Sequence, residues 1–281
     1  MNLENSSQNL SFQKYNLLLK LVNNLKIPYG YEHSARICHQ ALLPNRFLLT
    51  VNKKNIKQNP EETIIKICHF LDMPSDFIAA TAENITKAKF VHFGFEENQT
   101  TYLYKIYLEM GMPLKASDQK NSDDDSPILL HLGLKWDALN PEKHFITRYL
   151  WHPSITVQEI LQRLAEIYQG DMYLEAFDIV KNILEIAVNQ VGDDCIKYLE
   201  ITEDNNQRKS YDLNIYDAQL QVKDLHHVLM KICSYYSISD NLFIKFYNEI
   251  KNKLFGHIAG GIHRNGLDFF NVYYGVEGRH G

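Results

Sequence analysis

Apolar and polar residues alternate along several stretches, most clearly over residues 257–277, HIAGGIHRNGLDFFNVYYGVE. Asn265-Gly266 lies between two strand-like runs, and this dipeptide in such a setting is the strongest local signal for a β-hairpin with a type I′ turn. In the returning run, the even-numbered residues 270–276 are apolar, whereas Asn271 and Tyr273 share the opposite face. We therefore predict a hairpin with one apolar and one partly polar face.

The polar-x-Tyr ending of this hairpin recurs upstream. Each instance follows another strand-like run across a polar turn, and the four pairs are Lys105/Tyr107, Thr147/Tyr149, Asn214/Tyr216 and Asn271/Tyr273. Recurrence of one supersecondary unit indicates a diverged repeat. The alternative is chance, because tyrosine is favoured in strands and the chain contains 17 tyrosines.

Segments with apolar residues at helical spacing separate most of these hairpins. The hairpins are expected at residues 31–52, 89–109, 128–151, 195–216 and 257–277. Helices are expected at residues 12–25, 60–71, 75–84, 156–168, 173–189, 222–235 and 239–254, and a polar linker at residues 115–126. The order is helix, hairpin, helix, repeated about five times, without helices between the second and third hairpins.

Five hairpins joined in this way give a mainly antiparallel sheet of about ten strands. Because every helix has one apolar stripe, the helices should cover one face of the sheet. A sheet of this length tends to curl, and closure removes both of its edges. We therefore predict an α+β protein with one domain over residues 1–281, a ten-stranded antiparallel β-barrel surrounded by helices. The expected polar lumen is lined by His92, Glu96, Lys105, Tyr107, His131, Lys135, Tyr149, Glu200, Asp212, Asn214, Tyr216, Asn271 and Tyr273.

Composition narrows the class of protein. The hydrophobic content of 45% and charged content of 22% are those of a soluble globular protein. The net charge of −5 argues against a general nucleic-acid binder. The sequence shows no basic-then-apolar leader and no apolar run long enough for a membrane span. Its four cysteines are far apart, so we expect a reduced, cytoplasmic protein, and we expect it to be a monomer.

Four short strand segments, 45–49 (NRFLL), 94–96 (GFE), 105–107 (KIY) and 271–274 (NVYY), resemble those of ABBA prenyltransferases in their order and spacing. The chain looks most like the cyanobactin peptide prenyltransferases of that group, from about residue 30 to the C-terminus. This resemblance implies a barrel of αββα repeats. It also implies transfer of a dimethylallyl or geranyl group from its diphosphate to a side chain of a ribosomally made peptide.

The resemblance gives the polar residues roles that the chemistry can use. A diphosphate leaving group needs fixed cations, here Arg46, Lys105 and Lys135, with Asn214 and Asn271 beside them and Mg²⁺ bound through the diphosphate. The allylic cation needs aromatic faces that also exclude water, and the expected ring is Tyr107, Tyr149, Tyr216 and Tyr273. The structural alternatives are that the lysines pair with carboxylates and that the tyrosines are ordinary packing residues.

The acceptor needs a base, and the candidate catalytic carboxylates are Glu200, Asp212 and Glu96. Salt bridging to the lumen lysines is their structural alternative. Relatives tend to carry a carboxylate near the position of Cys38 and His39, where this chain has none, so the usual acceptor is in doubt. The several carboxylates elsewhere weakly favour a cationic acceptor, the guanidine of arginine.

Two other functions remain open, an ABBA enzyme for small indoles or phenols and a non-catalytic barrel that binds a ligand. Asp123-Asp124-Asp125 resembles the Mg²⁺ motif of helical isoprenoid synthases, but it lies in a polar loop and is interpreted as solvated. The histidines at 226, 227, 257 and 263 show no zinc-ligand spacing. The donor length and the acceptor residue are not determined by the sequence.

Overall fold

The computed structural model of the chain describes residues 3–98, 101–111, 126–204, 206–263 and 265–281. The Asp123–Asp125 run and most of the predicted linker 115–126 lie outside these residues. Ten antiparallel strands form a closed barrel in the order β1-β10-β9-β8-β7-β6-β5-β4-β3-β2. The strands are β1 (Pro28–Cys38), β2 (Ala41–Asn52), β3 (Ala88–Glu97), β4 (Tyr102–Met110), β5 (Ile128–Asp137), β6 (His144–Trp151), β7 (Lys197–Glu203), β8 (Asn206–Asn214), β9 (Phe255–Ile262) and β10 (Asp268–His280).

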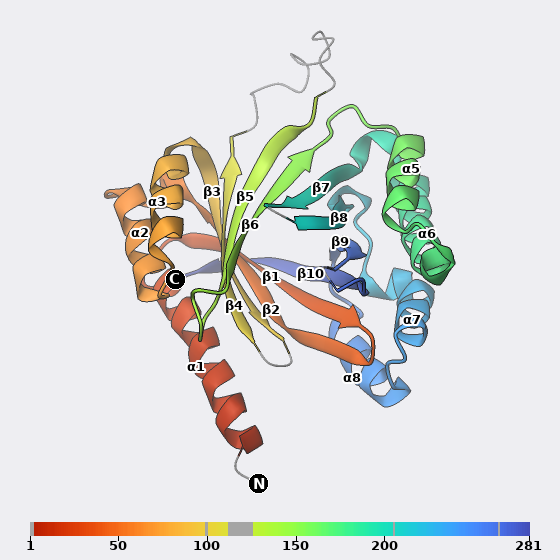
Figure 1. Cartoon of the computed structure of the whole chain (residues 1–281), viewed down its shortest axis with the longest axis horizontal. Coiled ribbons are helices and arrows are strands. Elements are labelled where there is room, and N and C mark those ends of the chain that lie inside the picture. The colour runs from red at the N-terminus through yellow and green to blue at the C-terminus, as the bar shows by residue number, and fades with distance from the viewer. Residues whose placement is uncertain (1–2, 99–100, 112–125, 205, 264) are drawn as a thin grey trace.

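The helices lie outside the barrel, in two groups on opposite sides (Figure 1). They are α1 (Leu3–Asn23), α2 (Pro60–Phe70), α3 (Ser75–Asn84), α5 (Val157–Ile167), α6 (Leu174–Val191), α7 (His226–Tyr235) and α8 (Asp240–Ile250). One hydrophobic cluster joins the first three helices to β1–β5, and a second joins the other four to β1, β2 and β7–β10. The apolar face of the sheet therefore meets the helices, and the other face encloses the lumen.

Local sequence signals explain where several helices begin. Thr156 forms a capping box with Glu159, in which each side chain accepts a hydrogen bond from the other's backbone N–H. Pro60 occupies the first position of α2, where a missing N–H costs nothing, and Glu61 and Glu62 follow in its positive first turn. None of the helices within the described ranges combines the length and the apolar character needed to cross a membrane.

The last hairpin is present, but its turn differs from the predicted one. Gly266 has a φ of 77°, and backbone hydrogen bonds define the connection around it. The Gly266 N–H donates to the His263 carbonyl, and the His263 N–H donates to the Leu267 carbonyl. The Asn265 side chain also accepts from the Leu267 N–H. Because the His263–Leu267 hydrogen bond closes the loop, the connection between β9 and β10 is longer than the two-residue loop of a type I′ turn.

The predicted closed, ten-stranded antiparallel barrel is confirmed. Every predicted hairpin and helix has its counterpart, with small differences at the ends. α1 begins at Leu3, nine residues before the predicted start at 12, and Tyr216 lies in a short 3₁₀ turn after β8 (Tyr216–Ala218). This last difference moves Tyr216 off the strand on which the sequence placed it.

Candidate functional site

The lumen contains two chambers, one toward each end of the barrel. The histidine chamber has a volume of about 340 Å³ and is defined by Glu32, His92, Glu109, His131, Asp212 and His257. The arginine chamber has a volume of about 710 Å³ and is defined by Arg36, Arg46, Lys135, Glu203 and Asn271. Residues at the hairpin turns, such as Asn98 and Asn265, line only the arginine chamber. The hairpin turns therefore lie at its end of the barrel.

Five side chains line both chambers and so form the boundary between them: Glu96, Lys105, Tyr107, Tyr149 and Tyr273. They come from four strands, β3, β4, β6 and β10. Their side chains alternate with outward apolar residues such as Phe95, Ile106 and Val272, which are buried under the helices. The predicted polar lumen face is thus confirmed at each of these positions.

Two cations meet on one carboxylate at this boundary. Glu96 forms ion pairs with both Arg46 and Lys105, and the exposed fractions of the three residues are 7%, 2% and 6% respectively. The Arg46 guanidinium also donates to the side-chain amide oxygen of Asn98 at 3.3 Å, whereas its Nε atom is buried without a hydrogen-bond partner. Burial lowers the pKa of Arg46 below its usual range. Arg46 therefore has a donor still unused on the arginine-chamber side.

Lys135 adds a third cation beside this pair. Lys105 and Lys135 are direct cross-strand partners on β4 and β5, and Lys135 is also buried. Like charges directly opposite each other destabilise a sheet. The Lys135 ammonium donates to the Tyr149 hydroxyl at 3.3 Å and lies 5.5 Å from the centre of the Tyr107 ring. Two buried lysines facing one another favour an anionic ligand between them.

The two predicted asparagines separate. Asn271 lines the arginine chamber, and its buried side-chain oxygen has no hydrogen-bond partner. Asn214 lines the histidine chamber, and its side-chain oxygen accepts from the Tyr216 N–H at 3.3 Å. Asn271 therefore shares a chamber with the three cations, whereas Asn214 does not, contrary to the expectation.

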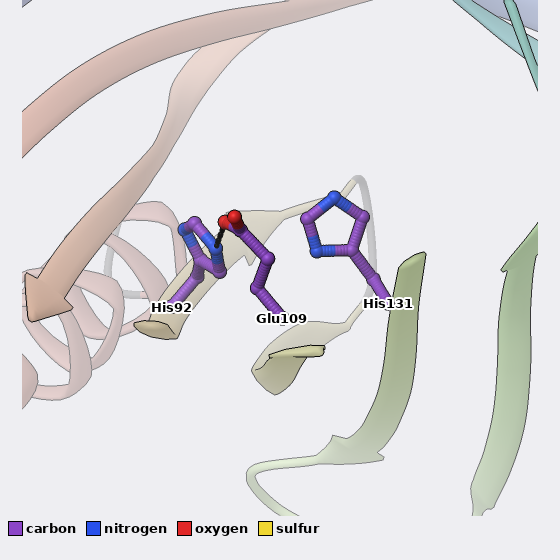
Figure 2. Close-up of side chains that lie close together, drawn as sticks. All are labelled: His92, Glu109 and His131. Carbon is purple, nitrogen blue, oxygen red and sulfur yellow. Dashed lines mark hydrogen bonds and ion pairs between the residues drawn. The ribbon is translucent and has the colours of Figure 1, made fainter. Parts of the chain in front are cut away.

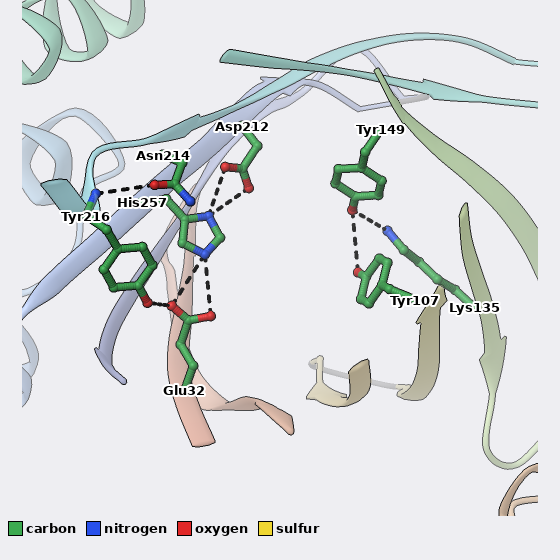
Figure 3. A network of polar contacts seen from close by, with 8 residues as sticks. All are labelled: Glu32, Tyr107, Lys135, Tyr149, Asp212, Asn214, Tyr216 and His257. Carbon is green, nitrogen blue, oxygen red and sulfur yellow. Dashed lines mark hydrogen bonds and ion pairs between the residues drawn. The ribbon is translucent and has the colours of Figure 1, made fainter. Parts of the chain in front are cut away.

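All four predicted tyrosines line the histidine chamber, and three of them also line the boundary. The rings of Tyr107 and Tyr149 meet edge to face at 5.5 Å, and Tyr273 stacks on His257 at 3.9 Å. Burial raises the pKa of Tyr107 and of Tyr273 well above the usual value, so both phenols keep their protons. Tyr216 differs because its hydroxyl donates to Glu32 at the far side of the chamber (Figure 3).

A glycine makes room for the Tyr107 ring. A Cβ atom on Gly133 would lie 2.8 Å from the Tyr107 ring and 2.4 Å from the Thr147 hydroxyl oxygen, which is closer than such atoms approach. Gly133 is also the direct partner of Tyr107 on β5. The absence of a side chain at this position therefore lets Tyr107 extend across the lumen.

His257 connects two buried carboxylates in the histidine chamber (Figure 3). Its Nδ1 atom lies 2.8 Å from the nearer Asp212 oxygen, and its Nε2 atom lies 3.4 Å from both Glu32 oxygens. Burial by itself lowers the pKa of His257, but the Asp212 and Glu32 carboxylates outweigh it and raise the pKa to about 10. At neutral pH His257 is therefore a cation held between two carboxyl groups, and it cannot act as a base.

The prediction that Glu200 faces the lumen is wrong. Glu200 lies on the outer face of β7, where the Arg163 guanidinium of α5 donates to it at 3.1 Å. The reason is the register, because Leu199 pairs with Asp212 and Glu200 pairs with Tyr211. Paired residues share a face, so Glu200 and Asp212 point in opposite directions. Of the three predicted catalytic carboxylates, Asp212 and Glu96 lie in the lumen.

Sequence reasoning missed Glu32 and His257 as members of this chamber. Glu32 lies on β1, whose pairing with β10 shifts register between Tyr31 and His33, so simple alternation does not determine which way its side chain points. His257 was considered only as a zinc ligand. The alternation of faces along the strands could have identified His257. It pairs with Asn214 and Tyr273, which were both expected to face the lumen, and directly paired residues share a face.

A second polar group, His92, Glu109 and His131, lies in the same chamber on β3, β4 and β5. The hydrogen bond and charge of His92 outweigh the effect of burial and lower the pKa of Glu109. Burial, followed by the charge of His92, lowers the pKa of His131 to about 3, so this imidazole is neutral. The sequence placed both histidines in the lumen but gave them no role.

Comparison with solved structures identifies the fold. The 5-dimethylallyltryptophan synthase from Streptomyces coelicolor matches with a TM-score of 0.60 and 11% identity, over 87% of this chain and 80% of that chain. The prenyltransferase PriB matches with a TM-score of 0.56 and 11% identity, over 87% and 79%. AnaPT from Neosartorya fischeri matches with a TM-score of 0.51 and 10% identity, over 90% and 80%.

PriB is a prenyltransferase by name, and the Streptomyces 5-dimethylallyltryptophan synthase has also been solved in complex with DMASPP and Trp. No family model matches the sequence, and no curated protein matches it either. At such low identity the likeness shows a shared fold. The chain therefore has the ABBA prenyltransferase fold, as the strand segments indicated.

Proposed function

We propose that this protein is a prenyltransferase that moves a dimethylallyl or geranyl group from its diphosphate to a side chain of a peptide. The observation that carries the proposal is the buried pair Lys105 and Lys135, with Arg46 close by, on one side of a boundary of tyrosine rings. Fixed, desolvated cations stabilise the charge that develops on a departing diphosphate. The same fold in known prenyltransferases supports this reading.

In this proposal the arginine chamber binds the diphosphate. Arg46, Lys105 and Lys135 contact its oxygens, and the Asn271 side chain binds beside them through its amide N–H. The ion pairs of Glu96 with Arg46 and Lys105 hold those two cations together when no substrate is bound. Asn214 is not part of this set, because it lines the other chamber.

Mg²⁺ belongs to the proposal as a partner of the diphosphate. Among the described residues, the one group of three His, Cys, Asp or Glu side chains with converging ligand atoms lies in the histidine chamber. Mg²⁺ prefers oxygen ligands and commonly binds through substrate phosphates with one or two carboxylates. The arginine chamber offers such carboxylates at Asp137 and Glu203, so its residues fit a diphosphate-bound ion. When bound there, Mg²⁺ adds positive charge to the leaving group.

The reaction breaks the bond between the allylic carbon and the diphosphate oxygen, which keeps the electron pair. Tyr107, Tyr149 and Tyr273 then present their faces to the allylic cation and exclude water. The acceptor atom in the histidine chamber donates its lone pair to the allylic carbon, and a base takes the acceptor's proton. Glu32 is the proposed base, since His257 is already protonated, and Asp212 holds His257 in place.

An arginine side chain is the acceptor that these carboxylates favour. Besides the boundary residue Glu96, the histidine chamber has three carboxylates, Glu32, Glu109 and Asp212, which is more than a neutral indole requires. A guanidinium carries five N–H donors and binds carboxylates in pairs. Loss of one proton to Glu32 as the C–N bond forms leaves a prenylated guanidinium, so charge is conserved.

A small aromatic acceptor is the second candidate. It is favoured by the solved complexes of similar prenyltransferases with tryptophan, and by the volume of the histidine chamber, about 340 Å³. Such an acceptor would stack near Tyr273 and use Glu32 in the same way. The two candidates share the donor site and differ only in what enters the histidine chamber.

Mass spectrometry on a panel of acceptors tests both candidates. Cyclic and linear peptides containing Arg, Trp, Tyr, His or Ser, and free indoles and phenols, would be incubated with protein, Mg²⁺ and dimethylallyl or geranyl diphosphate. We expect the mass of one prenyl unit, or two, on an arginine peptide, and far less product in the same time with a Lys105→Met variant. Transfer only to free indoles or phenols would establish the second candidate. No transfer to any acceptor by the folded protein would contradict both and leave a ligand-binding barrel.

A further inference from the structure

His92 and His131 have no role in the proposed transfer reaction, and together with Glu109 they have the composition of a metal site. One ligand atom from each residue lies within 4.8 Å of those from the other two. His92 Nε2 and a Glu109 carboxylate oxygen are 2.9 Å apart (Figure 2). The three residues come from the adjacent strands β3, β4 and β5, so a rigid sheet fixes their spacing.

The surroundings of the group resemble the supporting contacts of known metal sites. The Thr50 hydroxyl lies 2.9 Å from His92 Nδ1, which directs the other ring nitrogen, Nε2, toward Glu109. Ligating histidines in proteins usually have such a partner on the non-ligating nitrogen. His131 Nδ1 is buried without a hydrogen-bond partner, an arrangement that is costly unless a ligand binds there.

We propose that His92 Nε2, the Glu109 carboxylate and His131 Nδ1 bind one divalent transition-metal ion, with Zn²⁺ the best fit. Two imidazoles and one carboxylate are a common three-ligand set for zinc, and they leave a further coordination position open. Nitrogen ligands favour Zn²⁺ over Mg²⁺, so this ion is distinct from any Mg²⁺ bound with a diphosphate. The three residues line the histidine chamber, so the open position faces its interior.

This inference does not depend on the proposed transfer reaction. The bound ion would give the histidine chamber a Lewis-acidic centre. Its open position could coordinate a neutral nitrogen, oxygen or sulfur atom of a molecule bound in the chamber. The hydrogen bond now made between His92 and Glu109 would be replaced by two bonds to the metal. Zinc bonds of about 2 Å place neighbouring ligands a little over 3 Å apart, so the most widely separated ligand atoms need to approach by up to roughly 1.5 Å, while the His92 and Glu109 atoms separate slightly.

Isothermal titration of the metal-free full-length protein with Zn²⁺ tests the site. We expect one ion per chain, and binding at least about 100-fold weaker in His131→Ala, since loss of an outer partner alone costs 10–100-fold. His263→Ala is the matched control, because His263 lines the opposite chamber, and it should bind Zn²⁺ like the wild type. Circular dichroism would establish that each variant is folded. Equal affinity in all three proteins, or no binding at one ion per chain, would overturn the proposal.

Two further measurements separate a built site from binding at scattered histidines. Thr50→Val removes the hydroxyl next to His92 while keeping the shape, and we expect zinc binding to weaken 10–100-fold. Co²⁺ in place of Zn²⁺ should give the visible absorption of a four-coordinate ion, and added imidazole should change that spectrum by taking the open position. A Co²⁺ spectrum that imidazole does not change, or an unaltered affinity in Thr50→Val, would count against the site as proposed.

Discussion

The two chambers of the lumen differ in chemistry although the same strands line both. On β4, Lys105 and Tyr107 form part of the boundary, and Glu109 lines the histidine chamber. Residues two apart on a strand share a face and lie about 6–7 Å apart, so a cation, an aromatic ring and an anion follow one another along one face. Three alternate residues of one strand are therefore enough to separate the proposed leaving-group site from the proposed acceptor site.

The largest expected effect concerns Glu32, the proposed base in the histidine chamber. Glu32→Gln keeps the shape of the side chain but removes its capacity to take a proton, and we expect kcat for prenyl transfer to fall about 10²–10⁴-fold. Glu200→Gln is the matched control, because Glu200 contacts α5 outside the barrel. Steady-state kinetics on both variants measures the difference. A larger loss in Glu200→Gln than in Glu32→Gln would contradict the assignment of the chamber.

The second prediction concerns the cations of the opposite chamber. Lys105→Met keeps an apolar chain of similar length and removes the charge, so we expect kcat/KM for the allylic diphosphate to fall about 10²–10³-fold. Affinity for inorganic diphosphate, measured by calorimetry, should weaken in the same variant. Lys223→Met, at an exposed lysine in the short 3₁₀ helix Val222–Leu225, serves as the control. If both variants bound diphosphate like the wild type, the arginine chamber would not be the donor site.

The third prediction uses pH to examine the Glu32–His257–Asp212 contacts. The pKa of His257 is raised from 6.5 to about 10 by the two carboxylates, in spite of burial. Its stabilising contribution is therefore complete below the unfolded pKa of about 6.5 and is lost as the pH rises toward 10. From about pH 7 to about pH 9, the wild type should lose on the order of 2 kcal/mol of unfolding free energy relative to His257→Gln. Urea unfolding at several pH values measures this; parallel curves would show that His257 is not held as a cation.

The fold was predictable because it depends on patterns that repeat. The alternation of Phe93, Phe95 and Ile106 with polar neighbours defined two faces, and the helices supplied a cover for the apolar one. The lumen positions of Lys105 and Tyr107 follow from the same period of two, which needs no knowledge of partners. The Asn265-Gly266 dipeptide correctly marked the last hairpin, although its exact turn depended on contacts of His263 and Leu267.

The pairing of particular side chains was less predictable because it depends on register. One residue of difference in the pairing of β7 with β8 placed Glu200 outside, where sequence reasoning put it inside. Glu32 was missed because bulges interrupt the pairing of β1 on both sides. The convergence of Glu32 with His257, 225 residues apart in sequence, exists only once the barrel closes between β1 and β10.

The smallest expected effect lies at the boundary between the chambers. Tyr149→Phe removes a hydroxyl that lies 3.3 Å from the Lys135 ammonium and 3.5 Å from the Tyr107 hydroxyl, but it keeps the ring. Since one such hydrogen bond contributes about 0.5–1.5 kcal/mol, we expect less than about a tenfold loss of kcat/KM. Tyr149→Leu removes the ring, so more of the allylic cation should be captured by water. The ratio of prenyl alcohol to prenylated peptide, measured by mass spectrometry, should therefore rise in the leucine variant and not in the phenylalanine variant. An equal rise in both would mean that the hydroxyl, rather than the aromatic face, keeps the two chambers chemically separate.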